Sequence, residues 1–267
     1  MHLLAAVLTA LILPGFSQVQ TGPHGGRVLS GVFPGEMRPG LVYLPPGFST
    51  SQRYPVVYLL HGMPGSPNEY PDGTGLVNFA DDSIAAGSLR PFIGVLPAAG
   101  PDDRYNGEWA GPWENGLVDR IVPWVDARFP TLPDARDRVI AGLSAGGFGA
   151  VNIALRHPGL FGTVESWSGY FAPLRDGPFR HAKRAVLAAN DPTILARSQA
   201  AVLRQDGVRF FLSTGPAHSH WFRPQQTTDF TRELRALGLP VSYHLYSAAK
   251  HEYGTQLAVG LGFALRT

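Results

Sequence analysis

The sequence of 267 residues contains no cysteine, which excludes disulfide bonds, thiolate metal sites and a cysteine nucleophile. Charge is also scarce, since only 16% of the residues are charged and 22 basic side chains nearly balance 20 acidic ones. Lysine occurs only at Lys183 and Lys250. No cluster of lysine and arginine stands out along the chain, so nucleic acid is not expected as a partner.

Apolar residues are plentiful, at 44% of the chain, and include 15 Phe, 9 Tyr and 5 Trp. This composition excludes a mainly disordered chain. The length suits one large α/β domain or two small ones, with a substantial buried core.

The N-terminus carries an apolar run from Leu3 to Phe16 that is shorter than the ~20 residues needed to span a bilayer. It fits the central part of a secretory signal, although no basic residue precedes it and the first is Arg27. We therefore expect residues 1–20 to be a signal peptide or the remnant of a membrane anchor, ahead of one domain at 27–267. This predicts a secreted or cell-envelope protein, with a buried element of the fold as the alternative.

Short β-rich runs alternate with helical patterns after the first two strands. The expected strands are Arg27–Phe33, Leu41–Leu44, Val56–Leu60, Phe92–Leu96, Arg138–Ala141, Thr163–Trp167, Val208–Ser213 and Val241–Tyr246. The expected helices are Leu76–Ala86, Glu114–Arg128, Ala145–Arg156, Thr193–Gln205, Gln225–Leu237 and Tyr253–Leu265. This order predicts an α/β fold with a mostly parallel eight-stranded sheet, helices on both faces and an antiparallel pair at one edge.

The strongest chemical signal is the G-x-S-x-G sequence from Gly142 to Gly146, placed between an expected strand and an expected helix. This is the context of a nucleophile elbow, in which Ser144 occupies a strained turn and the glycines allow strand and helix to approach closely. The first free N–H groups of the following helix point toward the site where negative charge develops in acyl transfer. An ordinary serine in a glycine-rich turn is the structural alternative.

A second signal is His61-Gly62-Met63, directly after the strand Val56–Leu60. In sheets of this kind that loop supplies one backbone N–H of the oxyanion hole, here that of Met63, and the residue after the nucleophile, Ala145, supplies the other. We expect His61 to shape the loop rather than to transfer protons.

A serine hydroxyl needs a general base, and the chain order serine, acid, histidine favours His251 after the last strand. The other histidines considered for this role are His157, His181, His218, His220 and His244. Of these, His157 is expected at the far end of the helix after the elbow, and His244 inside a strand.

These residues resemble the esterase branch of the α/β-hydrolases, which includes esterase D type S-formylglutathione hydrolases, feruloyl esterases and secreted mycolyltransferases. The resemblance covers about Arg27 to Leu265 and is most specific in the block from Ala141 to Gly149. It implies a serine carboxylic-ester hydrolase or acyltransferase acting through an acyl-enzyme. In this reading Ser144 is the nucleophile, His251 the base, and the Met63 and Ala145 N–H groups the oxyanion donors.

The sequence departs from the family at the acid of the triad. The family usually places a carboxylate after the strand matched by Val208–Ser213, but Thr214–Trp221 contains none. Asp176, which follows the preceding strand, is the expected substitute. Two alternatives to Asp176 stay open. The acid is Asp229 in the next helix, or the triad has no acid and His218 or a carbonyl orients His251.

Two other classes of function remain. His218 and His220 with His251 or His244 would supply three nitrogen ligands to zinc in a metal hydrolase. The missing acid is also compatible with a non-catalytic binding protein of the same fold. Its exposed aromatics would include Trp109, Trp113, Trp221 and Phe222, which would otherwise line an acyl pocket or fill the core.

The sequence as a whole therefore predicts an ester hydrolase without cofactor or metal. Its substrate is a small-molecule, lipid or carbohydrate ester, and its contact with a membrane or cell envelope runs through the N-terminus.

Overall fold

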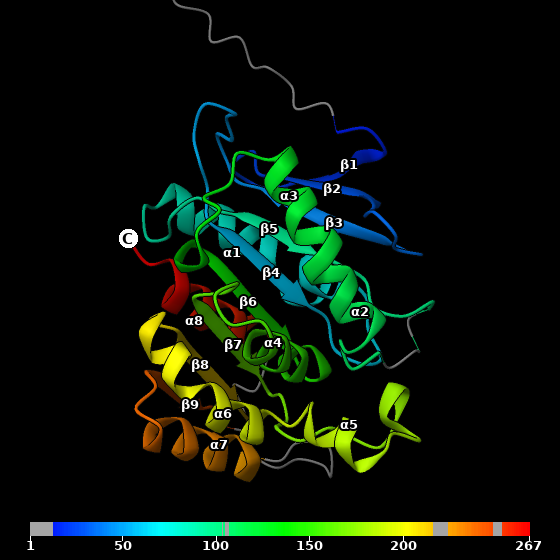
Figure 1. Cartoon of the computed structure of the whole chain (residues 1–267). Helices are drawn as coiled ribbons and strands as arrows, with labels where there is room; N and C mark the ends of the chain where they lie inside the picture. Colours follow the sequence, from blue (N-terminus) through cyan, green and yellow to red (C-terminus); the bar gives the residue numbers. More distant parts are fainter. Residues whose placement is uncertain (1–12, 103, 105–106, 216–223, 248–252) are drawn as a thin grey trace, which may run out of the picture.

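The computed structural model describes residues 13–102, 104, 107–215, 224–247 and 253–267. Within them, nine strands form one sheet in the order β1-β2-β3-β5-β4-β6-β7-β8-β9 (Figure 1). The strands are β1 (Phe16–Thr21), β2 (Arg27–Val32), β3 (Pro39–Leu44), β4 (Val56–Leu60), β5 (Ile93–Leu96), β6 (Arg138–Leu143), β7 (Thr163–Trp167), β8 (Arg209–Thr214) and β9 (Val241–Leu245).

The helices follow the expected pattern, with several short additions. The longer ones are α1 (Leu76–Ala85), α3 (Val122–Arg128), α4 (Ala145–Arg156), α6 (Pro192–Gln205), α7 (Pro224–Ala236) and α8 (Tyr253–Leu265). The short ones are α2 (Pro112–Asn115), α5 (Arg184–Ala188), the π-turns η1 (Glu69–Gly73) and η2 (Gly116–Ile121), and the 3₁₀-turns η3 (Ala135–Asp137) and η4 (Gly177–Phe179). None of the helices in these ranges is long and apolar enough to cross a membrane.

The sheet has nine strands rather than the expected eight. The additional strand, β1, pairs antiparallel with β2, starting from Phe16 opposite Gly31. The residues of β1 alternate too weakly in hydrophobicity to indicate a strand, and the apolar run Leu3–Phe16 that leads into them is typical of a targeting segment. The expected leader at residues 1–20 thus overlaps a strand at Phe16–Thr21, and its first twelve residues lie outside the described part of the chain.

The strand directions agree with the expected sheet, which is mostly parallel with antiparallel pairing at one edge. The pairs β1–β2, β2–β3 and β3–β5 are antiparallel, and every pair from β5–β4 through β8–β9 is parallel. Parallel strands need crossover helices, which cover both faces of the sheet. This accounts for the completely buried residues of β4, β5, β6 and β7.

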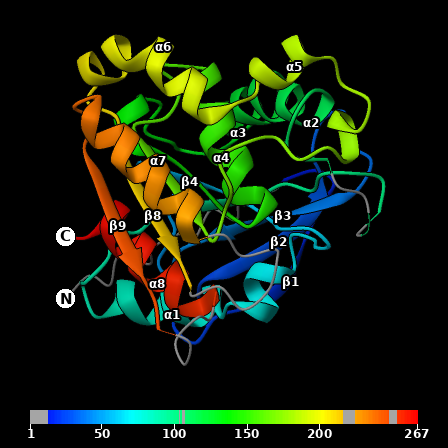
Figure 2. The ribbon, with the colours of Figure 1, turned by 90° about the horizontal axis from the view of Figure 1, so that it is seen from below.

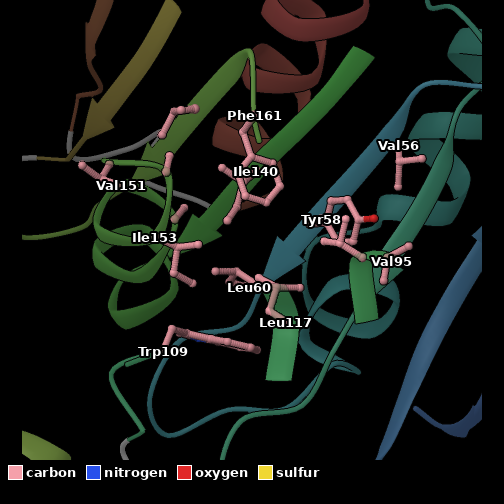
Figure 3. Close-up of a cluster of buried hydrophobic side chains, with 14 of the residues drawn as sticks. Val56, Tyr58, Leu60, Val95, Trp109, Leu117, Ile140, Val151, Ile153 and Phe161 are labelled. Atoms are coloured by element: carbon pink, nitrogen blue, oxygen red, sulfur yellow. The ribbon is translucent and has the colours of Figure 1, made fainter. Parts of the chain in front are cut away.

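The helices divide between the two faces. Figures 1 and 2 show α1 and α8 on one face and α3, α4, α6 and α7 on the other. The larger core lies under the second group, where Tyr58, Leu60 and Ile140 of the sheet meet Val151 and Ile153 of α4 (Figure 3). The opposite core joins strand residues to α1 and α8.

The expected single helix Glu114–Arg128 is instead three segments, α2, η2 and α3. The π-turn η2 ends just before Pro123, which has no N–H to donate to a carbonyl one turn earlier. The helix expected at Gln225–Leu237 ends within one residue of that position, at Ala236. Gly238, with φ of 69°, lets the chain turn there, and the Leu239 N–H donates to the Leu234 carbonyl at 3.0 Å.

Candidate active site

The turn between β6 and α4 holds Ser144 in a strained backbone conformation, with φ 50° and ψ −112°. Its N–H donates to the Trp167 carbonyl at 2.9 Å, and its carbonyl accepts from the Phe148 N–H at 3.0 Å. Ser144 therefore stands directly before the first turn of α4, tied both to the neighbouring strand β7 and to the helix.

The two glycines of the turn are required by close backbone approach. A Cβ on Gly142 would overlap the backbone of Gly146, and a Cβ on Gly146 would overlap the Leu60 carbonyl at the end of β4. The turn thus brings together the ends of β4 and β6 in a way that no other residue type permits. The strand–turn–helix geometry predicted for a nucleophile elbow is present.

The loop after β4 passes beside this turn. A Cβ built on Gly62 would lie 3.5 Å from the Ser144 Cβ and 3.3 Å from the Leu143 carbonyl oxygen. The Gly62 N–H donates to the Glu69 carboxylate at 2.9 Å, so Gly62 is fixed from the side of η1. Burial raises the pKa of Glu69. Met63, the next residue, packs against a small cluster that includes Ala145, so both expected oxyanion donors border one region.

His61 supports this loop. Its Nε2 accepts from the Ala99 N–H at 3.0 Å, so the proton sits on Nδ1, which donates to the Gly62 carbonyl at 2.8 Å. The Trp109 indole N–H donates to the His61 carbonyl at 3.0 Å. Burial lowers the pKa of His61 to about 4, which keeps the ring neutral at ordinary pH. With both ring nitrogens engaged by backbone groups, His61 shapes the loop, as expected.

The expected base, His251, lies outside the described residues, as do His218 and His220. Of the other histidines considered, His157 ends α4 and contacts Glu114 at 2.8 Å, away from the serine turn. His244 lies on the exposed side of β9 with its ring 4.3 Å from that of Tyr246. Neither has a position suited to deprotonate Ser144.

The two carboxylates considered for the triad lie in different surroundings. Asp176 precedes η4 on the segment after β7, and its charge contributes to raising the pKa of the buried Tyr170 hydroxyl, after burial itself and Glu108. Asp229 is exposed on α7, where its carboxylate accepts from Arg232 and Gln225 at 2.8 Å each. Asp229 is thus occupied at the surface, and Asp176 is the one beside the buried cluster that contains Ala145.

A buried Glu108–Tyr170 pair was not indicated by the sequence. Tyr170 donates its hydroxyl to the Glu108 carboxylate, and its ring stacks on Phe148 at 5.1 Å. Glu108 and Trp109 both have positive φ, at 49° and 50°. Phe148 and Tyr170 belong to the same cluster as Ala145 and Met63. No spacing in the sequence links these residues, because the pair joins two loops 62 positions apart.

Helix α8 is anchored to the carboxyl ends of β7 and β8 by Gln256. Its Oε1 accepts from Ser213 Oγ at 2.8 Å and from Ser168 Oγ at 3.2 Å, and Gln256 has no exposed surface. Ser168, like Ser144, has positive φ, at 53°. Because α8 begins just after residues 248–252, this anchor fixes the helix that follows the segment carrying His251.

Glu165 is a second polar residue in the contact with α8. Its Oε2 accepts from the Trp167 indole N–H at 3.0 Å, and its Oε1 has no partner among the described residues. Burial raises the pKa of Glu165 to about 8. Gly260 of α8 leaves the space this carboxyl occupies, since a Cβ there would overlap Oε2.

Within the described ranges, no group of three His, Cys, Asp or Glu side chains is arranged to hold a metal ion. Three of the histidines proposed as zinc ligands lie outside those ranges. The proposed exposed aromatic platform is wrong for Trp109, which is 2% exposed and belongs to the larger core, as Figure 3 shows. Trp113 is partly buried against the same core, and Trp221 and Phe222 lie outside the described residues.

The fold and the strained serine turn define the class of the protein, an α/β-hydrolase. A solved structure described as a ferulic acid esterase shares this fold, with a TM-score of 0.74 over 90% of this chain and 97% of its own, at 24% identity. Residues 31–259 match the profile of the family described as "Putative esterase", and the chain belongs to that family.

Two curated relatives are longer proteins. The chain is 31% identical over 238 residues to Esterase Rv1288 of Mycobacterium tuberculosis, covering 77% of this chain and 51% of that protein. It is also 36% identical over 146 residues to an Endo-1,4-beta-xylanase/feruloyl esterase of Xylanibacter ruminicola, covering 51% of this chain and 20% of that protein. The chain therefore spans about half or less of the length of these two relatives.

Proposed function

We propose that the protein is a serine hydrolase of carboxylic esters. The observation that carries this proposal is the backbone of Ser144, held at positive φ between β6 and the first turn of α4. Such a turn exposes the side-chain oxygen while directing helix N–H groups to the same place. Membership of the esterase family and the relatives named esterase or feruloyl esterase support it.

In the proposed reaction the Ser144 Oγ attacks the ester carbonyl carbon while His251 accepts its proton. The N–H groups of Met63 and Ala145 donate to the oxyanion of the tetrahedral intermediate. His251 then protonates the leaving alcohol as the bond between carbonyl carbon and ester oxygen breaks, which leaves an acyl group on Ser144. Water, deprotonated by the same imidazole, attacks the acyl carbon, and Ser144 recovers its proton.

Asp176 is the proposed orienting carboxylate for His251. It follows β7, and it lies close enough to the buried Tyr170 to influence the pKa of that hydroxyl. A carboxylate in this role keeps the imidazole in the tautomer that accepts from serine and stabilises its protonated form. The proposal requires no metal and no cofactor.

The proposed substrate is a small ester or an ester on a carbohydrate, in keeping with the feruloyl esterase named among the relatives. Transfer of the acyl group to an alcohol instead of water is the variant of this mechanism that the family resemblance also allows. Export from the cell, or attachment to its envelope through residues 1–20, is proposed from the apolar N-terminal run alone.

The test compares wild type with Ser144→Ala on p-nitrophenyl acetate and butyrate. Turnover by Ser144→Ala is expected to fall by at least about 10³-fold, because the remaining oxyanion donors act without a nucleophile. Ser198→Ala, a substitution on the exposed side of α6, serves as the matched control and keeps wild-type turnover. Equal turnover by wild type and Ser144→Ala would refute the proposal and favour a binding protein.

Covalent labelling gives an independent reading. A fluorophosphonate is expected to add to the peptide containing Ser144 and not to the one containing Ser168, although both serines have positive φ. Turnover that is lost on chelation, with no label on Ser144, would favour the metal-hydrolase alternative.

A further inference from the structure

A segment packed over the proposed site carries an excess of positive charge. This cap segment, residues 174–190, follows β7 and contains η4 and α5. It holds four of the 22 lysines and arginines but only one of the 20 acidic residues, so the rest of the chain has 18 basic and 19 acidic side chains. The whole positive balance of the protein therefore resides here, although no basic cluster was expected from the sequence.

The four cations have no partner in the part of the chain that the structure describes. Arg175, Arg180, Lys183 and Arg184 are exposed, and their side chains make no hydrogen bond or ion pair with other described residues. Seven arginines elsewhere in the described ranges do pair with carboxylates. They are Arg90, Arg120, Arg136, Arg138, Arg156, Arg197 and Arg232. Arg128, Arg235 and Arg266 are also exposed without a carboxylate partner among the described residues, but they lie on separate elements. The cap segment thus differs from the remaining surface in gathering four such cations within ten residues.

The acidic groups nearest in sequence do not neutralise this surface. Asp176 precedes η4 and is half-buried rather than exposed beside the cations. Asp191, just after the cap segment, accepts from the Thr193 and Ile194 N–H groups at the start of α6. Glu108 is buried in its hydrogen bond with Tyr170.

The inner side of the cap segment contacts the residues around the nucleophile. Phe179 belongs to the buried cluster that also contains Ala145 and Tyr170. Leu174, Ala182 and Leu187 pack against that cluster, as does Met63. In Figure 1, α5 lies beyond the carboxyl ends of the parallel strands, the end at which β6 turns into α4. The cations are therefore carried on a segment whose apolar side covers the surroundings of Ser144.

We propose that the cap segment binds an anionic part of the substrate, so that the preferred esters carry a carboxylate or phosphate near the scissile bond. The proposal rests on the proposed function, since it assigns a substrate class to the same site. Unpaired charges of one sign around a cleft raise the local concentration of an oppositely charged substrate and its rate of association. Because the cations are exposed, their effect weakens as salt is added.

The experiment measures kcat/KM for p-nitrophenyl butyrate, which is neutral, and for mono-p-nitrophenyl glutarate, whose acyl chain ends in a carboxylate. A second anionic ester, p-carboxyphenyl butyrate, carries its charge on the leaving alcohol and is compared with neutral p-acetylphenyl butyrate. The quantity of interest is the ratio of anionic to neutral kcat/KM within each pair. Its two values show whether the charge is recognised on the acyl or the alcohol side.

In the variant Arg180→Gln/Lys183→Gln/Arg184→Gln, the ratio for at least one pair is expected to fall about tenfold at low salt. Arg128→Gln/Arg235→Gln/Arg266→Gln is the matched control, because it removes the same charge at helix or chain ends away from the carboxyl edge of the sheet. The control keeps the wild-type ratio, and so does the charge-conserving Arg180→Lys/Arg184→Lys. Sodium chloride at about 1 M, where screening acts over ~3 Å, removes the wild-type preference.

An unchanged ratio in the cap variant, or an equal fall in the control variant, would overturn the proposal. A cap variant that loses activity on neutral and anionic esters alike would also overturn it, because the segment would then act only as a structural cover. Failure of the proposed function has a separate signature, in which wild type hydrolyses no neutral ester faster than Ser144→Ala.

Discussion

Replacing the buried Glu165 by glutamine is expected to change how the stability of the protein depends on pH. Burial raises the pKa of this carboxyl from 4.5 to about 8. The folded protein therefore holds a proton on Glu165 between these values, while the unfolded chain releases it. The free energy of unfolding is therefore highest at low pH and falls as the pH rises between these two values. In this range the unfolded chain is stabilised by releasing the proton and exposing the carboxylate to water, whereas the folded protein keeps the proton.

The size of the effect follows from the two pKa values. Each pH unit between them lowers the free energy of unfolding by about 1.4 kcal/mol, which amounts to about 2–3 kcal/mol from pH 5 to pH 7. Glutamine carries no charge at any pH and keeps an oxygen that accepts from Trp167. Glu165→Gln therefore loses this slope and gains stability relative to wild type as the pH rises.

Urea unfolding of both proteins at pH 5, 6, 7 and 8 measures the difference, and groups common to both cancel in it. Glu233→Gln is the control. Arg197 lowers the pKa of Glu233, so its contribution is lost only as the pH falls below about 4.5, and its line runs parallel to wild type in this range. Parallel lines for wild type and Glu165→Gln would refute the reasoning and show that Glu165 is ionised in the folded protein.

Three further predictions concern the elements around Ser144. Gly146→Ala is expected to cost about 1–3 kcal/mol in urea unfolding and to reduce esterase activity, because its Cβ would overlap the Leu60 carbonyl. Wild-type stability and turnover in this variant would contradict the tight turn. Gln256→Leu removes the acceptor of two buried serine hydroxyls and is expected to cost about 1–3 kcal/mol. Unchanged unfolding would show that this anchor contributes nothing. Asp176→Asn is expected to lower kcat by up to about 10⁴-fold with little change in KM. Full activity would leave the triad to another carboxylate or to a carbonyl.

The strands and helices around the site could be predicted from the sequence because their signals are local. The run Val56–Leu60 is continuously apolar, and Thr163–Trp167 begins with two β-branched residues and ends in an aromatic one. The two runs correspond to β4 and β7 without any change of boundary. The helices Ala145–Arg156 and Tyr253–Leu265 agree to the residue as well. The serine turn was equally predictable, since the glycines needed for its close backbone contacts lie two positions either side of Ser144.

Contacts between distant segments could not be predicted in this way. Gln256 meets Ser168 and Ser213 across 88 and 43 positions, and each of the three residues alone is an ordinary polar side chain. Strand β1 was missed for a related reason, because an edge strand with one weakly covered face carries little periodic signal.

By itself, the sequence determined the order of the strands from β2 to β9, the main helices between them and the position of the serine turn. These features depend on residues adjacent in the chain, whose backbone preferences and apolar pattern act over a few positions. Only the tertiary structure decided that Glu165 is buried beneath α8 and that the cations of the cap segment have no partner among the described residues. Burial and ion pairing depend on which distant residues the fold brings within a few ångströms, and no local pattern records that.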